Sequence, residues 1–188
     1  MPLAEDPSQL GSLAAQSPTD SVELFVPALS GLGTPYWDFG SLGLFLNLSS
    51  DSSPSSMANA IIKGIAHLGA DLVEAVENDS GTEYDEISVD GGMTVNSQFL
   101  QYLANYCQKR LLLSNNSEAT TIGAGLAGLL SNGTIKDIDE IDQIVQSSKT
   151  VSPQSHLNSL EVAKSRQIWH SAVEISLNTV PELSSVKF

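Results

Sequence analysis

Hydrophobic residues recur along this chain with two different spacings, and these predict which segments are strands and which are helices. Short apolar runs bounded by Gly, Pro, Asp or Ser are typical of strands, whereas apolar residues three and four positions apart are typical of helices. The predicted strands are Glu23–Leu29, Leu42–Leu48, Glu86–Asp90 and Leu111–Leu113. The predicted helices are a short one within Gln9–Gln16, a long one from Asp51–Ser56 to about Glu77, and further ones over Val95–Cys107, Ile122–Leu130 and Leu160–Leu177.

The order of these segments indicates a single α/β domain. Strands and helices alternate, which is typical of a layered fold in which helices cover a sheet. A chain of 188 residues is long enough for one domain with its own core. Residues 1–21 are rich in Ser, Pro, Ala and Asp, so we expect a lead-in or linker there and the domain over 22–188. Residues 134–155 are polar and acidic, and we expect a loop with a short helix.

The charge of the chain limits what it can bind. It carries 22 acidic against 8 basic residues, a net charge of −14, and residues 1–62 contain no Lys or Arg. Nucleic acid binding needs a basic face, so we expect no nucleic acid partner. If the chain holds a nucleotide, backbone groups and helix ends make most of the contacts to it, or cations are supplied from elsewhere. Most of the acidity is interpreted as a solvated surface.

The remaining composition bears on compartment and metals. A single cysteine, Cys107, excludes an internal disulfide and fits a reducing compartment, and its helical setting favours a small buried hydrophobe. No apolar run is long enough to span a bilayer, and the N-terminus is unlike a signal peptide, so we expect a cytoplasmic protein without a membrane partner. His67, His156 and His170 are far apart and lack metal-ligand spacing, so no metal site is predicted.

The segment Ile87–Asn96 carries the strongest sign of chemistry. A strand runs into Asp90, then into Gly91 and Gly92, then into a helix. Glycines accept positive φ and allow close approach, and the helix directs its unpaired N–H groups at the same place, so the pattern indicates a nucleotide-phosphate contact. Asp90 either lies near phosphate through water or metal, or forms the turn by bonding the next amides. Asn96 either binds a base or ribose, or satisfies backbone N–H groups at the helix start.

Two further segments contain unusual residues, but no complete catalytic set is present. The glycines, proline and aromatic pair of Ser30–Asp38 predict an ordered loop. The small residues of Glu118–Gly128 predict tight packing of a helix on its neighbours, which is our interpretation of Gly125 and Gly128. The chain lacks a P-loop, a Gly-x-Ser-x-Gly turn, a His-Glu-x-x-His helix and a marked acid/base pair, so no catalytic residue is assigned.

Four segments together resemble one known family. Phe25–Asp38 (FVPALSGLGTPYWD) resembles the glycerol kinase version of the FGGY carbohydrate kinases, and Val89–Asn96 (VDGGMTVN) resembles the adenosine-nucleotide motif of their C-terminal domain. Ser117–Gly128 (SEATTIGAGLAG) is similar to the family's next conserved segment, and Ser165–Val173 (SRQIWHSAV) to its last helix. The matches follow family order, so the chain is identified as the C-terminal domain of a member nearest to glycerol kinase.

The resemblance carries expectations of fold, activity and site. It implies an actin-like, ribonuclease-H-like fold, a mixed sheet with helices on its faces, and ATP-dependent phosphoryl transfer to a polyol or sugar hydroxyl with Mg²⁺. By the same resemblance Gly92 packs on the nucleotide phosphates and Asn96 contacts the adenine side. Gly91 and Met93 flank them, and Asp90 lies in the vicinity of phosphate or metal.

The family's other catalytic parts are not matched here. Its first phosphate loop, polyol contacts, catalytic aspartate and main Mg²⁺ ligands precede the matched region, so an N-terminal kinase domain is the expected partner beside ATP or ADP. An exposed apolar surface is expected where that partner would dock. Family members follow the Tyr-Trp-Asp of the loop with Pro and then Arg-Gly, whereas Asp38–Gly43 has no Arg, which questions any charge role of the loop.

Three hypotheses therefore stand beside one another. The first is the nucleotide-binding portion of a glycerol-kinase-like enzyme, which alone binds nucleotide without turnover. The second is a non-catalytic interaction or regulatory module that kept the fold. Self-association of the chain into a homo-oligomer would favour this hypothesis. The third is the same domain of a ketose kinase of the xylulose type.

Overall fold

A computed structural model describes residues 6, 9–18, 20–114, 119–144, 147–155 and 159–184. Its helices are α1 (Leu10–Ala14), α2 (Pro54–Ser80), α3 (Ser97–Cys107), α4 (Ala119–Ser131), α5 (Ile138–Ile144), α6 (Ser159–Ser176) and α7 (Pro181–Ser184). Its strands are β1 (Leu24–Val26), β2 (Leu44–Leu46), β3 (Glu86–Val89), β4 (Arg110–Ser114) and β5 (Ser147–Val151), and a 3₁₀ turn spans Gly92–Val95.

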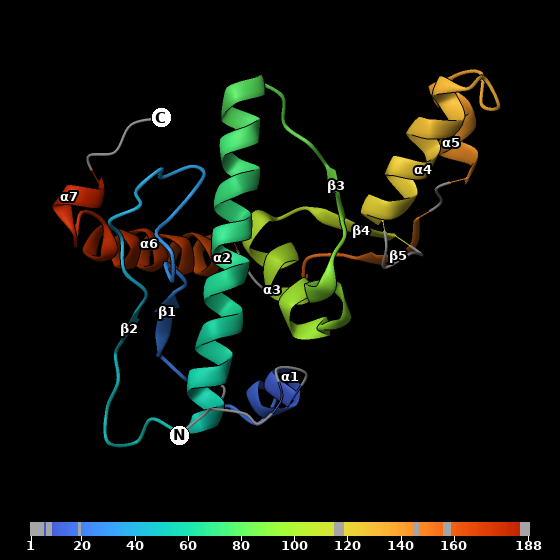
Figure 1. Cartoon of the computed structure of the whole chain (residues 1–188). Coiled ribbons are helices and arrows are strands. Elements are labelled where there is room, and N and C mark those ends of the chain that lie inside the picture. Colours follow the sequence, from blue (N-terminus) through green and yellow to red (C-terminus); the bar gives the residue numbers. More distant parts are fainter. Residues whose placement is uncertain are drawn as a thin grey trace.

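The strands form two small sheets on either side of the long helix α2 (Figure 1). β1 and β2 pair antiparallel, with Leu24 opposite Leu46. In the other sheet β3 and β4 run parallel, with Ile87 opposite Leu111, while β5 joins β4 antiparallel. The predicted α/β fold with a mixed sheet and helices on its faces is therefore confirmed.

Local sequence signals account for the ends of α2. The Ser53 side chain accepts a hydrogen bond from the Ser56 amide, and the Ser56 hydroxyl accepts one from the Ser53 amide, which makes a reciprocal cap. Pro54 fills the first turn, where its missing N–H costs nothing. Gly81 ends the helix in the left-handed conformation, with φ 64°, that glycine adopts without strain.

The core forms where α2 packs against α3 and β1. Small side chains on α2, namely Ala58, Ala66 and Ala70, let Leu100 and Leu103 of α3 come close and be buried. On the other side Gly64 lies under β1: a Cβ there would fall 2.0 Å from the Phe25 carbonyl oxygen. α2 therefore needs small residues on two faces, since both neighbours approach its backbone.

The lead-in segment contributes to this core. α1 packs against α2, and Ala14 is buried in the same cluster as Ala58 and Leu103. The short helix predicted within Gln9–Gln16 is present. The division between a linker over 1–21 and a domain over 22–188 stays a prediction.

Several other expectations need correction. The strand β5 lies in a region expected to be loop, because Ser147–Val151 is too short and polar to be recognised without its partner β4. The four-residue helix α7 was not predicted either. Cys107 is half-buried rather than fully buried, and its thiol donates to the Leu103 carbonyl at 2.9 Å. None of the described helices is both long and apolar enough to cross a membrane.

The predicted tight packing of the glycine-rich helix is wrong. α4 projects away from the body of the molecule together with α5 (Figure 1). A Cβ added at Gly123, Gly125 or Gly128 would meet no heavy atom within 4 Å. In this structure the small residues of α4 thus make no close approach to another element, because no described neighbour lies on that face.

Candidate functional site

The glycine turn predicted from Ile87–Asn96 has a backbone that depends on glycine. β3 ends at Val89, and Gly91 follows with φ 103° and ψ 176°, a combination almost restricted to glycine. The Thr94 amide and hydroxyl both donate to the Gly91 carbonyl, at 3.0 and 2.7 Å. These bonds close the 3₁₀ turn over Gly92–Val95 and direct the chain into α3.

Asn96 begins α3, and its side chain caps the helix. Its Oδ1 accepts hydrogen bonds from the amides of Gln98 and Phe99, at 3.0 and 3.1 Å. The structural role considered for this residue is therefore present. Its Nδ2 faces α1, where a Cβ added at Gly11 would lie 3.0 Å away. Within the described residues this Nδ2 has no hydrogen-bond partner, so a ligand contact stays open to it.

A cavity of about 580 Å³ lies between this turn and α1. It is lined by Leu10, Gly11, Ser12, Ala15, Gly92, Met93, Val95, Asn96, Ser97 and Gln98. None of these side chains is charged, and a volume of this size with few polar groups is typical of a ligand site. A Cβ at Gly92 would meet no atom of the described residues within 4 Å, so the backbone on that side is open to a ligand.

The structure brings together three of the five predicted site residues. Gly92, Met93 and Asn96 line the cavity, whereas Gly91 sets the backbone beside it. Asp90 is exposed at the end of β3, and among the described residues its carboxylate accepts no hydrogen bond. The turn-forming bonds considered for Asp90 are thus not seen in the described part of the chain.

The opposite wall of the cavity was missed by sequence reasoning. It comes from Leu10–Ala15, a segment expected to be lead-in. A short helix was predicted there. Nothing in the spacing of Leu10 and Gly11 indicates, however, that these residues lie beside Gly92 and Asn96, which come some 80 residues later in the chain. Gln98, two residues after the cap residue Asn96, was also missed.

A second polar cluster lies on the other side of the molecule and centres on Asp71. The Tyr36 hydroxyl and the Trp169 indole N–H both donate to Asp71 Oδ2 at 2.7 Å, and Arg166 forms an ion pair with Oδ1. Asp71 is 3% exposed, so its charge is held almost entirely by these partners. Burial and the nearby carboxylate raise the pKa of Tyr36, which keeps its phenol protonated as a donor.

The same cluster contains His170. His170 Nε2 lies 3.3 Å from Asp71 Oδ1, and ligand atoms of Asp71, Glu74 and His170 lie within 4.8 Å of one another. A metal ion could use such a set, but the Arg166 guanidinium already pairs with both carboxylates. The arrangement is therefore an ion-pair network. His156 lies outside the described residues.

His67, beside this network, is a buried neutral ring. It stacks between Tyr106 and Trp169, with ring centroids 3.7 and 5.1 Å away. Burial and the adjacent Arg166 lower the pKa of His67 well below its usual range. It thus serves the packing of α2 against α6.

The loop that departs from the family pattern is fixed by packing. Asp38 is buried, and its carboxylate accepts hydrogen bonds from the amides of Gly40 and Asn178, at 2.8 and 2.6 Å. Burial opposes its charge, but these bonds and one from Ser184 hold the pKa of Asp38 below its usual range. A Cβ at Gly40 would fall 2.2 Å from the Val180 carbonyl. The loop therefore anchors α7.

Comparisons with known proteins identify the family of this chain. Residues 4–131 match the model of the C-terminal domain of the FGGY family of carbohydrate kinases, and the chain belongs to this family. Glycerol kinase from Rhodopirellula baltica is 34% identical over 184 residues, 97% of this chain and 34% of that protein. Apulose kinase from Pectobacterium atrosepticum is 32% identical over 166 residues, 88% of this chain and 33% of that protein.

Solved structures show the same relationship. Plasmodium falciparum glycerol kinase with ADP superposes with a TM-score of 0.80 at 25% identity, over 93% of this chain and 35% of that one. Ligand-bound xylulose kinase from Lactobacillus acidophilus gives 0.72 at 26% identity, over 91% and 34%. The expected family and fold are confirmed. The chain spans about a third of the length of the curated relatives that it matches.

Proposed function

We propose that this chain forms the adenine-nucleotide side of an ATP-dependent carbohydrate or polyol kinase of the glycerol kinase type. The observation that carries the proposal is the uncharged cavity in which Gly92, Met93 and Asn96 face α1. This cavity lies at the family's nucleotide motif, in a chain whose structural neighbour was solved with ADP. An adenine ring fits an apolar pocket with a few amide groups.

The cavity suits the base and ribose better than the phosphates. No lysine or arginine lines it, so the phosphates would be met by backbone N–H groups of the open glycine turn. Gly92 permits that approach because no side chain covers its backbone. Asn96 Nδ2 is the donor available to the base or ribose.

Magnesium ions would be held largely outside this chain. Mg²⁺ prefers oxygen ligands and keeps several of its waters, so the exposed carboxylate of Asp90 fits a contact through water. Asp90 itself lies outside the cavity lining, and among the described residues no carboxylate belongs to that lining. When bound, the ion would neutralise charge on the transferred phosphoryl group.

Turnover requires groups that correspond to the other two thirds of the relatives. Phosphoryl transfer needs a base at the acceptor hydroxyl in line with the phosphates, and no residue of the cavity supplies one. We therefore propose an N-terminal kinase domain as the partner that completes the site. The single thiol of Cys107 fits a reducing cytoplasmic setting.

An amide NMR titration of the 188-residue chain with ADP and Mg²⁺ tests this proposal. We expect millimolar nucleotide to shift the resonances of Gly91–Asn96 and Leu10–Ala15. Gly92→Ala should weaken binding, because the added methyl group enters the cavity. Gly125→Ala is the matched control, since it also adds a methyl group into open space but lies in α4. A folded chain without any shift would refute the proposal.

The acceptor substrate is a separate question. Glycerol kinases and an apulose kinase match the sequence about equally well, and xylulose kinases share the fold. We favour a polyol, because the loop Ser30–Asp38 resembles the glycerol kinase version. An activity screen over polyols and ketoses, with the chain reconstituted with an N-terminal kinase domain, decides between them. Inactivity toward both classes, with the chain forming a stable dimer, would favour the non-catalytic module.

A further inference from the structure

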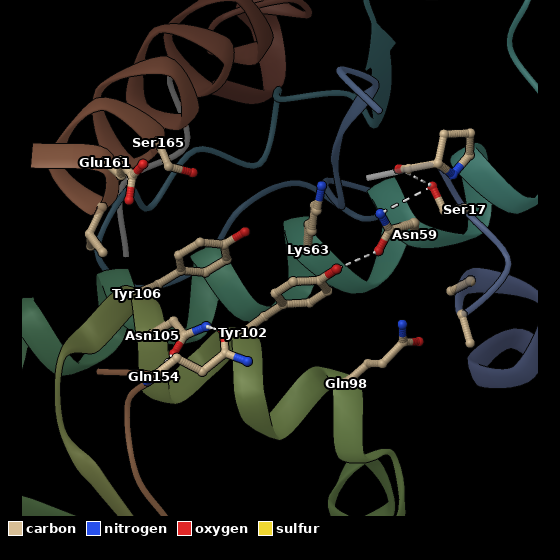
Figure 2. A pocket seen from close by; sticks show the side chains of 14 residues that line it. Ser17, Asn59, Lys63, Gln98, Tyr102, Asn105, Tyr106, Gln154, Glu161 and Ser165 are labelled. Carbon is tan, nitrogen blue, oxygen red and sulfur yellow. Dashed lines mark hydrogen bonds between the residues drawn. The ribbon is translucent and has the colours of Figure 1, made fainter. Parts of the chain in front are cut away.

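A second cavity, of about 560 Å³, opens between α2, α3, α6 and the chain that follows α1 (Figure 2). It shares Ala15 and Gln98 with the cavity at the glycine turn, but its other walls are different. Tyr102 and Tyr106 of α3 and Lys63 of α2 form its floor and one side. None of these three residues lines the cavity at the glycine turn.

Lys63 brings a positive charge into this cavity. Its side chain is half-buried, and its Nζ lies 5.7 Å from the centre of the Tyr102 ring. No carboxylate oxygen of the described residues comes within 4.0 Å of it. Burial lowers the pKa of Lys63, and the more distant Glu23 opposes that change. A half-buried cation without an ion pair favours an anionic ligand, which would replace the lost water contacts.

Most amide groups around Lys63 already have protein partners. Asn59 accepts from the Tyr102 hydroxyl at 2.9 Å and donates to Ser17, while Asn105 and Gln154 bond to each other. Gln98 is the exception: its Oε1 is buried and has no hydrogen-bond partner in the described part of the structure. Buried polar atoms in native proteins are almost always paired, so this acceptor indicates a missing hydrogen-bond donor such as a water, and the Nε2 of the same amide is the donor that Gln98 can offer to an anion.

The number of charges points to the class of ligand. Among the described residues Lys63 is the one cation in the lining, and Glu161 places an acid on the α6 wall. One lysine balances the charge of a single carboxylate, whereas a dianion such as phosphate would keep an unbalanced negative charge, which Glu161 also repels. The rings of Tyr102 and Tyr106 are inclined by only 8° and lie 5.9 Å apart, which adds a flat apolar wall.

We propose that this cavity binds a small organic carboxylate, with Lys63 as its counter-ion and the Gln98 Nε2 as a donor beside it, while a water donates to Gln98 Oε1. The site adjoins the cavity at the glycine turn, and Gln98 and Ala15 lie in both linings. The ligand should be flat, since one wall of the cavity is aromatic.

Benzoate is a suitable probe, because it joins one carboxylate to a flat ring. In an amide NMR titration of the full chain we expect saturable shifts at Gln98, Tyr102 and Ser165. Benzamide has the same shape without the charge, and inorganic phosphate has the charge without the ring. Both should bind at least about tenfold more weakly, as expected when a charge-assisted contact or its apolar support is lost.

Substitutions test whether binding depends on Lys63 itself or only on the overall charge of the chain. Lys63→Met should weaken benzoate binding about tenfold or more, and Lys63→Arg should retain most of it. Lys164→Met is the matched control, since it removes the same charge from an exposed position of α6 beside Ser165. If Lys63→Met fails to fold, the wild-type Lys63 side chain still reports, because benzoate should raise its pKa.

Three results would overturn the proposal. They are the absence of saturable benzoate binding to the folded chain, equal binding of benzamide, and equal weakening by Lys63→Met and Lys164→Met. Binding that saturates, requires the carboxylate and depends on Lys63 would support it.

Discussion

Two aspartates, Asp71 and Asp90, represent two polar regions that are built in opposite ways. Asp71 is buried, and both of its oxygens are occupied by Tyr36, Trp169, Arg166 and His170. Asp90 is exposed at the glycine turn and accepts no hydrogen bond from the described residues. The first region joins α2 to α6, whereas the second leaves its polar groups free for a ligand.

The difference shows how the chain divides stability from binding. A buried carboxylate is stable only when its oxygens are hydrogen-bonded or paired, and both oxygens of Asp71 are taken by protein groups. An open turn beside an uncharged cavity contributes little to stability, and its polar groups remain available to bind a ligand. Each of the following predictions tests one side of this contrast.

The largest effect should come from Asp71→Ala. Removing this carboxylate leaves the buried Trp169 N–H without a partner and the Arg166 guanidinium with only the exposed Glu74 of its two carboxylates, which should lower the free energy of unfolding by about 3–5 kcal/mol. Asp90→Ala should change it by less than about 0.5 kcal/mol. Urea unfolding followed by circular dichroism measures both. Equal costs at the two sites would remove the contrast.

A smaller effect is expected within the turn itself. Gly91→Ala should lower the free energy of unfolding by about 1–3 kcal/mol, because its φ of 103° is nearly restricted to glycine. Gly92→Ala should cost less than about 0.5 kcal/mol, since its Cβ enters open space. The same unfolding assay serves both variants. If both are neutral, the turn has another conformation in solution.

The stability contributed by Glu23 should depend on pH. Hydrogen bonds from Ser52 and Ser56 hold the pKa of Glu23 at about 2 in the folded chain, below its usual 4.5. Because the folded pKa is lower, the stabilisation is present above pH 4.5 and is lost as pH falls toward 2. Unfolding of the wild type and Glu23→Gln should therefore differ most near neutral pH. A difference that does not shrink in acid would contradict this.

The smallest effect should be a gain, at Gly125→Ala in α4. Alanine is favoured over glycine within a helix by about 0.5–1 kcal/mol, and the added Cβ meets no neighbour. Amide hydrogen exchange within α4 should slow by the corresponding factor. Faster exchange would mean that this face packs against something, and the tight packing expected from the sequence would regain support.

Local elements were predictable because their signals are local. The long helix α2 was identified from apolar spacing, the Ser and Pro residues at its start and the glycine near its end, and these are the groups that cap it. The turn at Gly91 was recognised because few residues other than glycine adopt its backbone angles. By contrast β5 was missed, since Ser147–Val151 becomes a strand only by pairing with β4.

The candidate site was predictable only in part for the same reason. Gly92, Met93 and Asn96 form one continuous motif, and the sequence places them together. The wall formed by α1 joins them only through the packing of α1 on α2, which brings Gly11 against Asn96. The glycines of α4 follow a pattern that suggests close packing, yet no described element lies against them.

What the sequence by itself determined is the succession of strands and helices, the glycine turn and the family to which its motifs belong. These depend on backbone preferences and on residues close together in the chain. The tertiary structure alone decided that Leu10–Ala15 closes the cavity at the glycine turn, that Asp71 meets Trp169, and that Lys63 faces a second cavity without an ion pair to any described residue. Such contacts join residues distant in sequence, and they follow from how the helices pack rather than from any local pattern.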